Sequence, residues 1–233
     1  MRWTKKMKTL SNVLKIKIFQ ETACYKKPFA LKVAETYPLP PYSTTKGLFH
    51  KLIDAKEFFP FHISVQGTYE CIVNNYQKML FYKDDLNATT MPLNVNLLYN
   101  VNLIIHAFYP DEKVLTNLYN RLAAPNEYLS LGRREDLAIV TDLKFVKLKL
   151  VDFEDLDEPY ILKNNIYIPS SYLEDVEVSG INYIVNYSYE LENGKRKWNK
   201  VLVKYVENGG IFESGKFYLD EEGDIAVFYP LMR

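Results

Sequence analysis

The sequence predicts an α+β fold in which strands outnumber helices. Apolar and polar residues alternate with a period of two in several segments, among them Val13 to Phe19 and Phe145 to Leu150, and this period is typical of half-buried strands. Two other segments place apolar residues three and four positions apart, which is the spacing of an amphipathic helix. The elements predicted in this way follow in chain order.

The chain opens with a strand, a proline-rich loop and a helix. We expect the strand at Val13 to Phe19, where apolar residues alternate with lysines. Thr36 to Tyr42 contains three prolines, whose fixed φ and missing N–H exclude both a helix and a central strand. Apolar residues then recur at helical spacing, which predicts a helix over Thr44 to Asp54 with Ser43 as its N-cap.

The middle of the chain predicts more strands and a second helix. Two stretches, Thr68 to Phe81 and Leu93 to Tyr109, are long for simple strands. Paired with each other, they would form a hairpin that projects beyond its sheet, with Lys83 to Pro92 at the tip. The remaining elements expected here are a strand at Phe61 to Gln66, a helix over Val114 to Leu122 and a strand at Leu137 to Leu150.

The resulting order is strand, helix, strand, strand, helix, strand, which is that of the ferredoxin-like unit and of RNA-recognition-motif domains. We therefore predict an RNA-recognition-motif-like domain at residues 11–150, with the projecting hairpin at about 74–100. Residues 151–233 form a second region, predicted to be β-rich and acidic. It begins with an acidic linker and contains a hairpin whose turn is Asn193-Gly194.

The charges are distributed unevenly along the chain. The formal net charge is zero, but Lys and Arg exceed Asp and Glu by 8 in residues 1–150 and fall short by 8 in residues 151–233. A basic front part is typical of a protein that binds a polyanion. Chance, together with charged side chains on ordinary solvent-exposed surfaces, would explain the same charge difference. The acidic back part would repel nucleic acid and is expected to face other proteins.

Composition and motifs exclude several classes of protein. No apolar run approaches the roughly 20 residues that span a bilayer, and the N-terminus lacks a secretory signal, so we expect a cytoplasmic protein. Cys24 and Cys71 are too few for a disulfide framework, and we expect both to be buried thiols. The familiar nucleotide-binding, hydrolase and zinc motifs are absent. His50, His62 and His106 have no carboxylate at relay or metal spacing, so neither a cofactor nor a metal is predicted.

Two short clusters are candidates for binding phosphate. In the first, Tyr42, Ser43, Thr44 and Lys46 bring hydroxyls and an amine to a helix start, although an ordinary N-cap explains the same residues. In the second, a glycine turn precedes Arg133 and Arg134, whose guanidinium groups suit phosphate oxygens. An ion-paired surface turn explains this second cluster equally well.

Both clusters lie in segments that resemble a known family. Thr36-Tyr37-Pro38-Leu39-Pro40-Pro41-Tyr42-Ser43-Thr44-Thr45-Lys46-Gly47 resembles the N-terminal signature of the Cas-five family of CRISPR proteins. Leu131-Gly132-Arg133-Arg134-Glu135-Asp136 resembles a second motif of that family, particularly of type I-B-like members of the Cascade surveillance complex. The resemblance extends over residues 13 to about 150.

The resemblance implies a role in antiviral defence. A Cas-five subunit would bind the 5′ handle of the CRISPR guide RNA and cap the backbone of Cas-seven subunits, with the projecting hairpin as its thumb. Its partners would include a large Cas-eight-type subunit and, through the ribonucleoprotein complex, target DNA. The residues that would contact RNA are Tyr42, Ser43, Thr44, Lys46, His50, Arg133 and Arg134.

Two alternatives remain beside RNA binding. Type I-C members of the family cut precursor guide RNA with a metal-free tyrosine, lysine and histidine, and Tyr42 or Tyr37, Lys46 and His50 supply these residue types. The adjacent Lys-His pair of that subgroup is absent, however, because Ile105 precedes His106, so we predict no catalytic residues and no nuclease activity. The other alternative is a protein-interaction module that makes no RNA contact.

Overall fold

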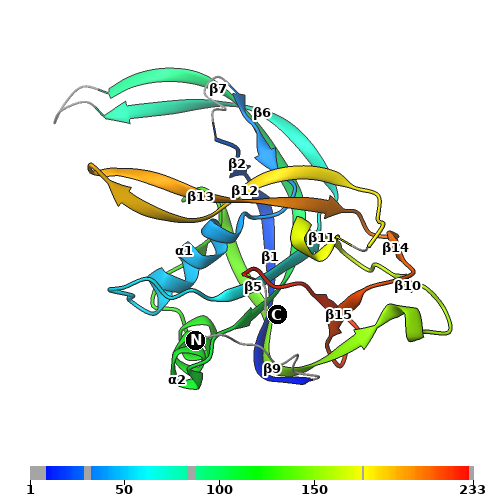
Figure 1. The fold of residues 1–233 in the computed structure, drawn as a ribbon. Helices are drawn as coiled ribbons and strands as arrows, with labels where there is room; N and C mark the ends of the chain where they lie inside the picture. Colours follow the sequence, from blue (N-terminus) through cyan, green and yellow to red (C-terminus); the bar gives the residue numbers. More distant parts are fainter. Residues whose placement is uncertain (1–8, 29–32, 83–87, 175, 231–233) are drawn as a thin grey trace.

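The computed structural model describes residues 9–28, 33–82, 88–174 and 176–230, and the fold is α+β as the sequence predicts. Strands dominate, and most of them join one largely antiparallel sheet of 12 strands in the order β12-β13-β11-β5-β7-β1-β9-β15-β16, with β3, β6 and β8 attached to its sides. Figure 1 shows this sheet as a strongly curved surface, with the two helices together on one side.

The elements of the front part follow the predicted order closely. They are β1 (Thr9–Ala23), β2 (Tyr25–Lys26), β3 (Val33–Ala34), β4 (Thr36–Tyr37), α1 (Tyr42–Leu52), β5 (His62–Thr68), β6 (Cys71–Tyr82), β7 (Ala88–Phe108), α2 (Glu112–Ala123), β8 (Leu129–Ser130) and β9 (Leu137–Asp152). Four of these strands run side by side as β5-β7-β1-β9, every neighbouring pair being antiparallel.

The helices cover one face of these four strands. The alternate residues Leu14, Ile16 and Ile18 of β1 point into this core, where they meet Phe49 of α1 and Leu118 of α2. The start of α1 differs from the expectation. The helix begins at Tyr42 directly after Pro41, and no side chain caps it, so Ser43 is not the N-cap but lies in the first turn. Pro41 is itself the N-cap residue, and its φ of −56° and ψ of 151° are the extended backbone expected at that position.

The projecting hairpin is present and consists of β6 and the first half of β7. Its pairing runs from Cys71 opposite Tyr99 to Tyr82 opposite Ala88, so the strands extend further toward the tip than expected. The expected tip lies partly in residues 83–87, outside the described residues. Figure 1 shows the two strands curving away from the body of the molecule. Cys71, expected to be buried, is exposed at the base of this hairpin.

The C-terminal part adds strands to both ends of the central sheet. Its elements are the short 3-10 helices Phe153–Asp155 and Ser170–Tyr172, and the strands β10 (Tyr160–Ile161), β11 (Asn165–Pro169), β12 (Ile181–Glu192), β13 (Lys195–Val206), β14 (Ile211–Phe212), β15 (Lys216–Leu219) and β16 (Ile225–Ala226). The hairpin expected around Asn193-Gly194 joins β12 to β13, with positive φ at both turn residues. This backbone is typical of a tight two-residue turn. The division into two regions at residue 150 stays a prediction.

The last strands also cover the second face of the four central strands. Tyr218 and Phe228 pack against Val13 of β1 and Leu148 of β9. Polar groups join the layers as well, since Ser64 Oγ accepts a hydrogen bond from the backbone N–H of Val227. Both faces of the central sheet are therefore covered. Among the described residues, no helix is long and apolar enough to cross a membrane.

Candidate nucleic-acid interface

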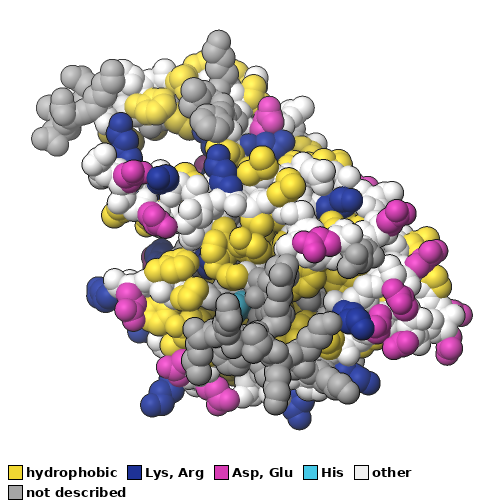
Figure 2. All heavy atoms as spheres, in the orientation of Figure 1, with side chains coloured by type: hydrophobic (Ala, Val, Ile, Leu, Met, Phe, Trp, Pro, Cys, Tyr) yellow, Lys and Arg dark blue, Asp and Glu magenta, His cyan; other side chains and the backbone are white. Residues whose placement is uncertain are grey.

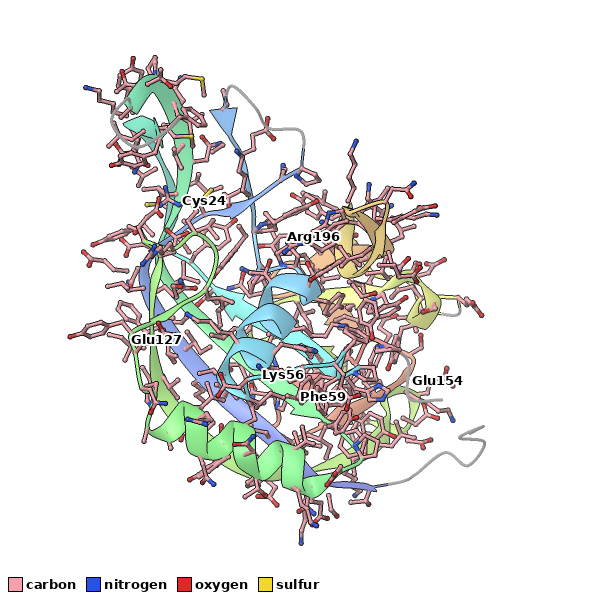
Figure 3. The ribbon with its side chains drawn as sticks, turned by 90° about the vertical axis from the view of Figure 1, so that its left-hand side faces the viewer. Cys24, Lys56, Phe59, Glu127, Glu154 and Arg196 are labelled. Atoms are coloured by element: carbon pink, nitrogen blue, oxygen red, sulfur yellow. The ribbon has the colours of Figure 1, made fainter. Side chains whose placement is uncertain are left out.

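A groove of about 350 Å³ lies where three elements meet. They are the start of α1, the segment between α2 and β9, and the beginning of β13. Figure 3 shows Glu127 and Arg196 on the last two of these elements, on either side of α1. The groove is lined by Ser43, Thr44, Gly47, Leu48, Lys51, Leu52, Glu127, Tyr128, Leu129, Ser130, Leu131, Gly132, Arg196 and Trp198.

The helix start gives the groove a favourable environment for an anion. The side chains of Ser43 and Thr44 line the groove, and the first turn of α1 carries no acidic residue. The partial positive charge of a helix N-terminus therefore meets no carboxylate of its own helix. Gly47 has open space where a Cβ would lie, although it occupies the middle of the helix. The missing side chain leaves the helix backbone accessible from the groove.

Two cations lie at the rim of the groove. Lys51 forms an ion pair with Glu127 at 2.7 Å, and both side chains are largely exposed. Such a surface pair contributes about 0–1 kcal/mol to stability. The other cation is Arg196, which is exposed near the tip of the β12–β13 hairpin. Figure 2 shows Lys and Arg side chains, with some Asp and Glu, on the projecting parts at the left of the molecule.

Tyr42 and Lys46 do not line the groove. Tyr42 is fully buried and stacks on Tyr229, with ring centroids 5.7 Å apart. Lys46 Nζ is buried, has no hydrogen-bond partner among the described residues, and lies 3.0 Å from the centre of the Tyr187 ring. Burial lowers the pKa of Lys46 to about 7. Lys46 was expected to contact RNA, but the structure shows that Tyr187 of the C-terminal hairpin covers its amine.

His50 is held by the backbone. Its Nδ1 lies 2.7 Å from the Lys46 carbonyl oxygen, and its Nε2 accepts a hydrogen bond from the N–H of Phe59 at 2.9 Å. Burial lowers the pKa of the imidazole, with a smaller opposing effect of the hydrogen bond to the Lys46 carbonyl. Since both ring nitrogens contact backbone groups, the neutral form with Nδ1 protonated fits these contacts best.

The two adjacent arginines have different surroundings. Arg133 is mostly buried and donates from Nη2 to Asp136 at 2.7 Å and from Nη1 to Gln77 of the projecting hairpin at 3.0 Å. It thus ties its loop to the base of that hairpin. Gly132, with φ +113°, makes the preceding turn possible. Arg134 is exposed and has no hydrogen-bond or ion-pair partner within the described ranges.

A second group of charges lies beneath the C-terminal strands, on the face away from the helices. Lys15 is fully buried, and its Nζ contacts Asp220 at 2.5 Å, Glu222 at 2.7 Å and Asp224 at 2.7 Å. His106, directly opposite Lys15 on β7, contacts Asp220 through Nε2 at 3.1 Å. Burial would lower the pKa of Lys15, but the three carboxylates raise it.

This cluster was not found from the sequence. The three carboxylates lie close enough together to hold a cation, and the Lys15 ammonium occupies that position. No local spacing connects Lys15 or His106 with Asp220, because more than 100 residues separate them along the chain. Only the tertiary structure shows that Asp220 is the partner of His106.

Comparison with known proteins identifies the family. A family model described as CRISPR-associated protein (Cas_Cas5) matches residues 13–197. The chain belongs to the Cas-five family. The match includes both motifs on which the resemblance rests and confirms it, and it extends beyond the expected limit near residue 150. A comparison with curated proteins gives no match.

Comparison with solved structures gives matches to chains of CRISPR proteins, and one of them has a TM-score above 0.5 and a similar fold. A chain of a "CRISPR RNA-guided surveillance complex" matches with a TM-score of 0.55 at 10% identity, covering 92% of this chain and 93% of its own. A CRISPR protein from Archaeoglobus fulgidus covers 92% of this chain and 98% of its own, at 13% identity and a TM-score of 0.45. A chain of the type III-B Cmr-beta complex bound to cognate target RNA and AMPPnP covers 86% of each chain, at 10% identity and a TM-score of 0.47.

Proposed function

We propose that this Cas-five protein is a subunit of a CRISPR effector complex that binds the 5′ handle of the guide RNA and caps a backbone of Cas-seven subunits. The observation that carries the proposal is the groove at the start of α1, since it combines a helix N-terminus, the hydroxyls of a family motif and two cations at its rim. A helix start and exposed cations together suit a chain of phosphates.

The strand arrangement supports an RNA-recognition-motif-like unit. The order β5-β7-β1-β9, with both helices on one face, is the order that such a unit requires. The hairpin of β6 and β7 would be the thumb. The open sheet face through which RNA-recognition motifs stack bases is covered here by the C-terminal strands. RNA would therefore bind at the helix side, along the groove.

The residues expected to contact RNA fall into two groups, those that would touch phosphate and those that would position the others. Ser43 and Thr44 would contact phosphate directly, and Arg134 would provide a free cation beside the groove. Arg133 would act by positioning its loop, because its guanidinium is already bonded to Asp136 and Gln77. Tyr42, Lys46 and His50 would support the helix from its buried side rather than touch RNA.

We also propose that the protein binds RNA without cleaving it. Metal-free cleavage needs a base close to a 2′-hydroxyl, and none of the three imidazoles lines the groove. His106 is fully buried. In the presence of chelator, labelled repeat RNA should stay intact with the purified chain. Cleavage that is lost in His50→Ala or His106→Ala would instead establish the endoribonuclease.

The test of RNA binding uses a charge placed in the groove. Thr44→Glu adds a carboxylate beside the proposed phosphate, yet a glutamate in the first turn favours the helix itself, so the fold is retained. The matched control is Thr116→Glu, which places the same change at an exposed position of α2. Each tagged variant is purified with its native partners, and the bound RNA is sequenced from its 5′ end.

We expect wild type and Thr116→Glu to carry RNA with one uniform repeat-derived 5′ handle. Thr44→Glu should retain about tenfold less, since one unfavourable phosphate contact of about 1.4 kcal/mol changes affinity tenfold. Equal handle RNA in both variants would exclude the groove as the binding site. Random or absent RNA in the wild type would contradict handle binding altogether.

A further inference from the structure

Base stacking needs an accessible aromatic ring, and C-terminal residues pack on the sheet face that RNA-recognition motifs use for stacking. Among the described residues, only two aromatic side chains line the groove, Tyr128 and Trp198. Tyr128 is 89% exposed and makes no ring contact among the described residues. Trp198, in contrast, is partly buried and belongs to an ordered set of side chains on the C-terminal hairpin.

This set is a ladder across β12 and β13. Trp198 pairs directly with Tyr189 on the neighbouring strand, and their rings meet edge to face with centroids 5.3 Å apart. The Arg196 guanidinium lies 4.6 Å from the centre of the Tyr189 ring. Cross-strand aromatic pairs hold each other in place. Tyr189 thus fixes both groove residues, the Trp198 indole and the Arg196 guanidinium.

The ladder lies in a basic part of an otherwise acidic region. Residues 151–233 contain 8 Lys and Arg, and five of these lie on β13. They are Lys195, Arg196, Lys197, Lys200 and Lys204. Only Glu190 and Glu192 oppose them on β12. The expectation that the whole back part repels nucleic acid therefore does not apply to this hairpin.

We propose that Trp198 and Arg196 form a stacking site for one unpaired RNA base, in the same groove as the start of α1. A planar indole and a planar guanidinium are the surfaces on which single-stranded bases stack, independently of sequence. The phosphate next to that base lies toward Ser43 and Thr44, which line the same groove. This assignment rests on the proposed RNA binding and adds the residues that receive a base.

The chain offers a direct spectroscopic readout, because it contains only two tryptophans, Trp3 and Trp198. Trp3→Phe leaves Trp198 as the single indole. This full-length variant is titrated with an eight-nucleotide oligoadenylate RNA and with an abasic RNA backbone of the same length. The two probes carry the same phosphates, so their difference reports the bases alone.

We expect the oligoadenylate to quench Trp198 fluorescence and the abasic backbone to bind with little quenching. In the Trp198→Ala variant, oligoadenylate affinity measured by anisotropy should fall about 5- to 150-fold, the range for one lost base stack. Trp198→Phe should restore most of it. Abasic affinity should stay the same in all three proteins. Leu202→Ala, an exposed change on the same strand but outside the groove, is the control.

Failure of this inference can be distinguished from failure of RNA binding. If oligoadenylate binds equally to wild type and Trp198→Ala, without quenching, the stacking site is wrong and the groove proposal stands. If Trp198→Ala instead weakens only assembly with the other subunits, the ladder is a protein contact and the inference is again overturned. If neither RNA binds the wild type, both proposals are wrong.

Discussion

The two faces of the central sheet use charged residues in opposite ways. Beneath the C-terminal strands, Lys15 and His106 are fully buried and meet three carboxylates. On the helix side, the groove presents hydroxyls, Arg196 and a weak surface ion pair to solvent. The buried cluster contains more titratable side chains than the groove, but they are paired with one another. Titratable residues therefore indicate a binding site only when their partners are known.

Two buried lysines make the contrast sharper. Lys15 and Lys46 both lie beneath C-terminal elements, but Lys15 has carboxylate partners, whereas Lys46 is surrounded by the rings of Tyr187 and Phe58. The pKa of Lys15 is accordingly raised, and that of Lys46 is lowered to about 7. One buried charge is compensated and the other is costly.

The largest expected effect is that of Lys15→Met. This change leaves Asp220 and Asp224 buried without their cation, and breaking a buried pair in this way costs about 3–5 kcal/mol. Urea unfolding followed by circular dichroism measures the loss. Lys17→Met, which removes a partly exposed contact to Glu222, should cost less than about 1 kcal/mol. Similar losses for both would show that the closed cluster contributes no more than a surface pair.

Arg133→Ala and Arg134→Ala separate positioning from binding. Arg133→Ala removes charged hydrogen bonds to the buried Asp136, so the free energy of unfolding should fall by about 1.5–3 kcal/mol. Arg134→Ala should leave stability within about 0.5 kcal/mol. It should also reduce the slope of log affinity against log salt by about 0.7, the value for one phosphate contact on single-stranded RNA. If Arg134→Ala instead lowered stability and Arg133→Ala reduced the salt dependence, Arg134 would be the positioning residue and Arg133 the phosphate contact.

Lys46→Met should have the opposite sign to Lys15→Met. Removing a buried amine that has no hydrogen-bond partner within the described residues should stabilise the fold by about 1 kcal/mol at pH 7. In the wild type, the folded pKa near 7 lies below the unfolded value of about 10.4, so the unfolded state binds more protons between these values. Stability should rise with pH over that window, and in Lys46→Met this rise should disappear. Destabilisation by Lys46→Met would show that the amine has a partner.

Gly47→Ala should change stability only slightly, and it tests the groove alone. Alanine should stabilise α1 by about 0.5–1 kcal/mol, because glycine is a poor helix former and nothing lies within 4 Å of the added Cβ. If RNA approaches the helix backbone there, affinity should fall severalfold while thermal stability rises. Unchanged affinity would place the RNA away from Gly47.

Local patterns predicted the elements well, and tertiary contacts decided the roles of side chains. Period-two alternation located β1 and β9, and the Asn193-Gly194 turn located the C-terminal hairpin. The same reasoning placed Lys46 toward RNA, because helical spacing shows which face is apolar but not which other element covers the opposite face. It also missed the ladder of Tyr189, Arg196 and Trp198, although their alternation on two strands of one hairpin could have indicated it.

The sequence by itself determined the α+β class, the order of the elements and the family motifs, because hydrophobic period, turn residues and prolines act over a few neighbouring positions. Only the tertiary structure decided that one sheet face is closed over Lys15 and His106, and that the groove lies on the other side. Burial and charge pairing join residues more than 100 positions apart. Their energies depend on distance in space, which no local spacing records.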